Sequence, residues 1–312
     1  MLASVLVLAP FAVGIVPAAA ALAGARWPQR SPAAAILLWQ ALGLSWGLAA
    51  VGTLAGLGAE PGRYGVTGGA LTGASRALAD VTALFSGHGM VAAAKLASLA
   101  AGATLLALLC SVLVEASAGV QRARRRQRVL LRLLAHGDPK VPGALVVDHA
   151  GAAAYCVPGL RSAIVISAGT LDLLDQAELA AVLAHERAHL RERHDLVLLP
   201  FTALLHAFPR SGLARQVYRT VALLVEMLAD DYALRHRPAR ELATALIRVG
   251  TVGLVSAPSG ALAVAAGSEE VAARVSRLLA PPHPLRWPAV ALVCAASAVL
   301  VLIPAVALVF SF

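Results

Sequence analysis

Four long apolar segments constrain the fold of this chain more than any other feature of its sequence. They cover residues 2–24, 33–57, 91–115 and 289–310. Each is long enough to cross a bilayer, which takes about 20 residues of helix. Hydrophobic residues make up 59% of the chain and charged residues 14%, whereas soluble domains have roughly 45–50% and 25%. We therefore expect an integral membrane protein.

The charge pattern predicts an orientation. A cleaved signal peptide is the alternative for residues 2–24, but the start of the chain has no positive side chain, and Arg26 and Arg30 follow the apolar run. We expect an uncleaved helix with its N-terminus outside. After the third segment comes a basic cluster, which marks the cytoplasmic side of a span: Arg122, Arg124, Arg125, Arg126 and Arg128. We expect a multi-pass protein of the cell membrane, with residues 58–90 as an outer loop.

Charge and cysteine usage exclude two other classes of protein. The net charge is +9, but aromatic residues make up only 4% and the basic residues cluster beside an apolar segment. Such residues serve topology and the headgroups of the lipid bilayer, so we expect no direct nucleic-acid binding. Three cysteines without metal spacing, two of them in apolar segments, predict no disulfide framework.

A helix predicted from residue 175 onwards carries candidate chemistry. Asp175 and Glu178 form a helix-start pattern, and apolar residues then recur at three- and four-residue steps. His185 and His189 lie one above the other on such a helix and can hold one ion between them. Glu186 lies beside the first imidazole, where it can take a proton from water at the metal. This H-E-x-x-H spacing indicates a zinc site, and the alternative is a solvated helix face.

A second predicted helix, residues 221–233, has an acid within its apolar run. Glu226 and Asp230 lie four apart and share a face, although like charges at this spacing destabilise a helix. A metal resolves this conflict if Glu226 is its third ligand and Asp230 holds the far nitrogen of a ligating histidine. Two histidines and one glutamate leave a fourth position open, which is typical of catalytic zinc. The alternative is a salt bridge from Glu226 to an arginine.

The run H-E-R-A-H, followed by E-M-L-A-D, resembles the gluzincin metallopeptidases. In its wider context, roughly residues 136–240, the chain is similar to the membrane peptidase family of the beta-lactam sensor-transducers (the BlaR/MecR type). We expect this chain to lack the penicillin-binding sensor domain of those proteins. The resemblance implies a Zn²⁺ site with His185, His189 and Glu226 as ligands, Glu186 as catalytic base and Asp230 as partner of a ligand.

Three short runs, residues 144–148, 152–156 and 163–167, predict strands separated by turn residues. The resemblance implies that one edge strand, built from Ile164, Val165 and Ile166, pairs with an extended peptide substrate. The alternative is a sheet that only supports the zinc helix.

Two helical regions outside the motifs complete the pattern. Residues 195–208 are apolar but too short for a span, so they form either a core helix or a segment dipping into the membrane. Residues 268–279 predict an amphipathic helix with Arg274 and Arg277 on its polar side. We expect His194, His206 and His236 to be ordinary surface or core histidines.

Together these features predict a mainly α membrane protein. We expect three transmembrane helices in residues 1–118, a cytoplasmic α+β zincin-like peptidase domain in residues 119–285 and a fourth transmembrane helix in residues 286–312. The expected activity is zinc-dependent hydrolysis of peptide bonds in a protein substrate. A transcriptional repressor is one candidate substrate, which would give the protein a role in signal transduction. The alternatives are a quality-control protease of the HtpX kind and a non-catalytic membrane signalling module.

Overall fold

The computed structural model describes residues 2–58, 71, 75, 89–139, 141–159, 162–256 and 261–309. Within these residues helices dominate, and one sheet has four short strands. The chain divides into two compact units. Unit 1 comprises Met1–Glu115, Pro200–Tyr218 and Leu285–Phe312, and unit 2 comprises Ala116–Leu199 and Arg219–Pro284. The predicted outer loop lies almost entirely outside the described residues.

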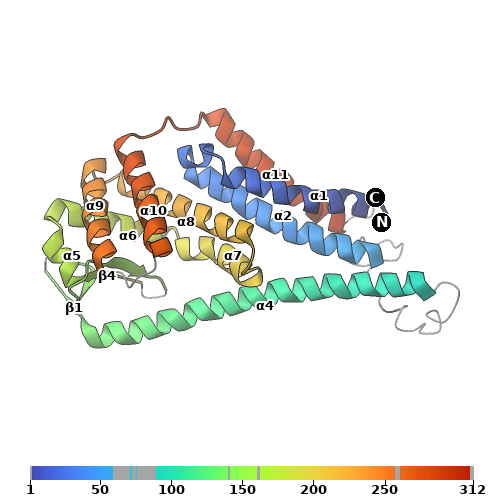
Figure 1. The fold of residues 1–312 in the computed structure, drawn as a ribbon, viewed down its shortest axis with the longest axis horizontal. Coiled ribbons are helices and arrows are strands. Elements are labelled where there is room, and N and C mark those ends of the chain that lie inside the picture. The colour runs from blue at the N-terminus through green and yellow to red at the C-terminus, as the bar shows by residue number, and fades with distance from the viewer. Residues whose placement is uncertain are drawn as a thin grey trace. The chain divides into compact units, whose positions relative to one another are not determined.

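Four of the described helices are long and apolar enough to cross a membrane, as the sequence predicts. They are α1 (Leu2–Ala23), α2 (Pro32–Gly58), α4 (Gly89–Leu134) and α11 (Trp287–Val309). In unit 1, α2 packs against both α1 and α11 (Figure 1). Ser45 of α2 is buried and donates a hydrogen bond to the backbone oxygen of Leu300 in α11, at 2.8 Å. The hydroxyl of Ser45 is thus satisfied between the helices, as an apolar environment requires.

The helix α4 differs from its prediction in length. The third apolar segment was expected to end at residue 115, but α4 continues through the basic cluster to Leu134 and has 46 residues. The extension is rich in Arg, Leu, Ala and Gln, which are good helix formers, and contains no proline. The expected domain boundary at residues 118/119 therefore lies inside a continuous helix, and the domain limits stay predictions.

Unit 2 contains a mixed four-stranded sheet with the order β1-β2-β4-β3. Its strands are β1 (Ala135–Gly137), β2 (Ala144–Val147), β3 (Ala154–Val157) and β4 (Ala163–Ser167). Strand β4 pairs in parallel with β2 and antiparallel with β3. The three predicted strands are confirmed within two residues, while β1 was not predicted.

The prediction that Ile164, Val165 and Ile166 form an edge strand is wrong. These residues belong to β4, which has a neighbour on both sides and presents no free backbone edge. The physical reason is the parallel pairing with β2, and the apolar residues at consecutive positions suit burial of both faces of such a strand. All three side chains are buried. The open edge beside β4 is β3.

The helix α6 (Gln176–Arg191) is fixed between the sheet and the other helices of unit 2. Its residues Leu179 and Leu183 share a core cluster with Ile164 and Ile166 of the sheet. The predicted helix start is confirmed: Asp175 Oδ1 accepts hydrogen bonds from the backbone amide of Glu178, while Glu178 Oε2 accepts one from the amide of Asp175. This reciprocal cap fixes the first turn of the helix that carries the histidines.

The remaining helices of the described chain are α5 (Ala168–Leu173), α7 (His194–Ala207), α8 (Gly212–Ala233), α9 (Ala239–Ser256) and α10 (Ala261–Leu279). The helix α7 covers the short apolar segment, and its last eight residues belong to unit 1. In unit 1, Phe208 lies edge-on against Trp46 of α2, with ring centroids 6.1 Å apart. Insertion of this segment into the membrane stays a prediction.

Candidate metal centre

Three side chains from two helices of unit 2 converge on one point. His185 and His189 of α6 and Glu226 of α8 each offer a ligand atom, and these atoms lie within 4.8 Å of one another. The two Nε2 atoms are 3.1 Å apart, and the Glu226 carboxylate lies 3.3 Å from Nε2 of His185 and 3.5 Å from Nε2 of His189. Among the described residues, no other group of three such side chains could hold an ion. The structure thus brings together the three side chains that were predicted from the sequence as metal ligands.

Exposure increases from one side of this cluster to the other. The side chain of His185 is 8% exposed, that of His189 is 15% exposed, and that of Glu226 is 36% exposed. The cluster is therefore held firmly on the His185 side and remains accessible on the Glu226 side. This gradient suits a site that must admit a substrate.

Asp230 lies where the sequence places it, behind His185. Nδ1 of His185 is 2.9 Å from Asp230 Oδ1, at ion-pair distance although off the direction of an ideal hydrogen bond. Because a carboxylate can only accept, it favours the tautomer in which Nδ1 carries the proton. The Nε2 lone pair then points at the Glu226 carboxylate, which is also an acceptor. A cation between these atoms resolves the opposition, and a set of two imidazoles and one carboxylate suits zinc.

The charges around the cluster support the same donor set. Burial lowers the pKa of His185, but the carboxylates of Asp230 and Glu226 outweigh it and raise this pKa to about 9. Burial raises the pKa of Glu226, yet the two neighbouring histidines, together with the charge of Arg274, hold it well below its usual range. The carboxylate is therefore ionised at neutral pH, as a metal ligand must be.

Glu186 is buried beside the cluster, with 9% of the residue exposed. Burial raises its pKa, and the neighbouring histidines oppose this rise only in part. A carboxylate whose pKa moves upward toward neutrality takes up and returns a proton more readily than a solvated one. The electrostatic setting of Glu186 thus suits a general base.

The sequence analysis missed the role of Arg274. It was expected on the polar side of a helix, but the residue is buried and binds two of the three acids of α8, Glu226 and Asp230. Nη1 lies 2.9 Å from Glu226 Oε2, while Nε and Nη2 donate to the two oxygens of Asp230 at 2.9 and 2.7 Å. The salt bridge considered as an alternative for Glu226 therefore exists, alongside the metal-ligand geometry.

Arg274 also sets the charge of the site. The carboxylates of Glu186, Glu226 and Asp230 carry three formal negative charges, and the guanidinium offsets one of them. The remainder equals the charge of one divalent ion, so the residues fit zinc in charge as well as in donor type. One signal in the sequence is a pair of arginines three apart, Arg274 and Arg277, that could bind the two adjacent acids Asp230 and Asp231. Arg277 does bind Asp231, at 2.6 Å.

The open edge of the sheet, β3, packs against α6. The backbone amide of Ser167 donates to the oxygen of Ala153 at 2.9 Å. In an antiparallel pair the direction of the backbone groups alternates, so those of Tyr155 also face β4, and those of Ala154 and Cys156 face the free edge. Burial raises the pKa of the Cys156 thiol to about 12, and the charges of Glu186 and Asp195 add to this effect. Cys156 therefore lies within the electrostatic influence of the site.

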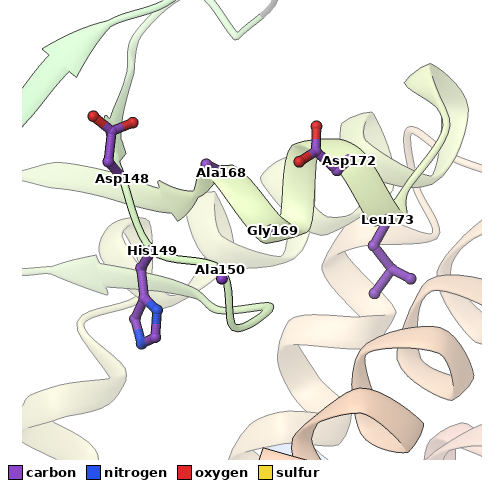
Figure 2. Close-up of a pocket in the computed structure, with 7 residues that line it drawn as sticks. All are labelled: Asp148, His149, Ala150, Ala168, Gly169, Asp172 and Leu173. Carbon is purple, nitrogen blue, oxygen red and sulfur yellow. The ribbon is translucent and has the colours of Figure 1, made fainter.

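A separate cavity of about 590 Å³ opens beside β2 and α5, and it includes none of the predicted site residues. Figure 2 shows that the carboxylates of Asp148 and Asp172 and the ring of His149 do not converge there. The His149 ring instead accepts a hydrogen bond from the amide of Gly151, at 3.2 Å. This cavity lacks the geometry of a second metal centre.

Comparison with known proteins agrees with the chemistry of the cluster. No curated protein and no solved structure matches the chain. The narrower resemblance to the beta-lactam sensor-transducers stays a prediction. Residues 120–266 match the model of peptidase family M48. The matched range includes His185, His189 and Glu226 but not Arg274, and the match supports a metallopeptidase of that family.

Proposed function

We propose that this chain is a membrane zinc endopeptidase that hydrolyses peptide bonds of protein substrates at the cytoplasmic face of the cell membrane. The observation that carries the proposal is the convergence of His185, His189 and Glu226 beside a buried Glu186. The match to peptidase family M48 and the four apolar helices support it.

The roles follow from the positions of the side chains. His185, His189 and Glu226 would hold zinc, which supplies Lewis acidity that lowers the pKa of water to about 7 and polarises a carbonyl. Glu186 accepts a proton from the attacking water while the oxygen of that water bonds to the peptide carbonyl carbon. Glu186 then delivers the proton to the leaving amine as the carbon–nitrogen bond breaks. Asp230 holds the ring of His185, and Arg274 holds the carboxylates of Glu226 and Asp230 in place.

We assign the substrate to the edge strand β3. An extended peptide can add a strand there through the outward backbone groups of Ala154 and Cys156. Such pairing gives affinity with a loose sequence preference, because it reads the main chain.

Labelling of Cys156 tests this assignment in the Glu186→Gln protein that also lacks Cys110 and Cys294. Burial is the largest cause of the raised thiol pKa and persists without the Glu186 charge, so alkylation at pH 8 should be slow and should accelerate about tenfold per pH unit up to pH 10. Unfolded casein should slow the reaction further by covering the edge. Alkylation at the same rate with and without casein would exclude β3 as the substrate strand.

The positive-inside pattern supports the cytoplasmic placement. Inside-out membrane vesicles carrying the protein should cleave added unfolded casein, and a zinc chelator such as 1,10-phenanthroline should stop the cleavage. Right-side-out vesicles should leave casein intact. Cleavage by right-side-out vesicles alone would reverse the orientation and keep the activity, whereas cleavage by neither preparation would refute the proposed function.

The identity of the natural substrate belongs to the same proposal. The resemblance to the sensor-transducers makes a transcriptional repressor one candidate. Comparing the proteins of cells that carry the intact chain with those of cells that carry Glu186→Gln identifies the substrate as the protein that accumulates uncut in the variant.

A further inference from the structure

His194 contacts the cluster through His189, whereas Asp230 contacts it through His185. It is the first residue of α7, and its side chain is only 2% exposed. Its Nδ1 lies 3.0 Å from Nδ1 of His189, and its Nε2 lies 3.2 Å from a carboxylate oxygen of Glu192. The sequence gave it the role of an ordinary histidine, but both of its nitrogens contact residues of the α6 end.

The backbone brings this ring into place through a tight connection. Arg193, which joins α6 to α7, has a φ of 51°, in the left-handed region that residues with a side chain seldom adopt. The chain adopts this conformation where it must reverse direction so that the next residue, His194, reaches back to His189.

The hydrogen-bond roles follow from Glu192. A carboxylate can only accept, so Nε2 of His194 carries the proton and donates to it. In the neutral ring the other nitrogen is then an acceptor. Nδ1 of His194 therefore accepts from Nδ1 of His189, and the proton of His189 must be on Nδ1.

The same assignment follows from the metal side. Nε2 of His189 faces His185 and Glu226, so as a ligand it offers a lone pair and leaves its proton on Nδ1. That proton needs an acceptor, and Nδ1 of His194 lies at the right distance. Glu192 on one side and the metal cluster on the other thus each require, independently, that the proton of His189 is on Nδ1.

We propose that His194, held by Glu192, is a positioning residue that fixes the tautomer and orientation of His189 for zinc binding. The proposal rests on the proposed function, because it assigns His189 as a ligand. The two histidines are then supported by different partners. His185 is held by the carboxylate of Asp230, and His189 is held by the neutral imidazole of His194, which in turn donates to Glu192. Losing an outer partner of a metal ligand typically costs about 10–100-fold in metal affinity.

Two substitutions at His194 separate this role from simple packing. His194→Asn loses volume but keeps an oxygen close to the position of Nδ1, whereas His194→Phe keeps a ring but offers no acceptor. The zinc dissociation constant of each purified full-length protein is measured by competition with a chromophoric chelator, and the cobalt-substituted protein is examined by its visible spectrum. His236→Asn serves as the matched control, since His236 is exposed in the same unit.

If His194 positions His189, His194→Phe weakens zinc binding by about 10–100-fold and alters the cobalt spectrum, while His194→Asn stays within a few-fold of the intact protein. Glu192→Gln, which leaves an acceptor for Nε2, causes a smaller loss. The reverse order, with Phe tolerated and Asn damaging, or equal affinities in both variants, overturns the inference and leaves the proposed function standing. An intact protein that binds no zinc overturns both.

Discussion

Replacement of Glu186 by Gln is expected to lower peptide hydrolysis by about 10²–10⁴-fold while zinc remains bound. The substitution keeps the size and shape of the side chain but removes the carboxylate that accepts the proton. Glu186 is not among the three convergent ligand atoms, so the donor set stays intact. The measurements are the initial rate of casein cleavage and the zinc content of the purified protein by elemental analysis.

A matched control is Glu269→Gln, because Glu269 is an exposed glutamate of α10. Its cleavage rate and zinc content should equal those of the intact protein. If Glu186→Gln cleaves as fast as the intact protein, Glu186 is not the base. If it loses its zinc instead, Glu186 has a structural role in the site.

Glu226→Ala and Arg274→Met are expected to differ in their effects, although each breaks the same salt bridge. Glu226→Ala removes a metal ligand and should weaken zinc binding by more than the about 10–100-fold expected for loss of an outer partner. Arg274→Met should keep all three ligands but leave the buried Asp230 without its cation. Removing one partner of a buried ion pair costs about 3–5 kcal/mol, so this variant should be the less stable of the two without metal. Zinc titration and thermal unfolding of the metal-free proteins measure the two effects.

This pair of variants decides between the two interpretations of Glu226. If Glu226 only forms a salt bridge and no zinc site exists, both variants and the intact protein should all bind little zinc. The two variants should then lose thermal stability to a similar degree. Arg277→Met is the control for loss of a guanidinium from α10, since Arg277 binds Asp231. We expect its zinc affinity to match that of the intact protein.

Local patterns in the sequence predicted much of this arrangement. The capping box at Asp175 and Glu178, the four apolar helices and the strands β2, β3 and β4 depend on neighbouring residues, and the structure confirms them. The cluster was predictable for a similar reason, because the four-residue spacing of His185 and His189 fixes their geometry on one helix. Glu226 required one further step, the recognition that an acid in an apolar run needs a partner.

The features that were missed depend on contacts between distant residues. The interior position of β4 follows from its parallel pairing with β2, which no local pattern specifies. Arg274 binds Asp230 across 44 positions in the sequence, and on its own helix it resembles any solvated arginine. His194 lies five residues beyond His189, and only the left-handed turn at Arg193 brings the two rings together. Sequence spacing cannot reveal a conformation that most residues avoid.

The guanidinium of Arg274 has a consequence for how the protein acquires its metal. It gives Glu226 and Asp230 a charged partner within the protein itself, so their positions do not depend on an ion alone. The emptied protein should therefore keep its shape, and stripping and refilling should be reversible over many cycles. If the proposed function holds, we expect the peptidase activity of the folded protein to follow the supply of zinc.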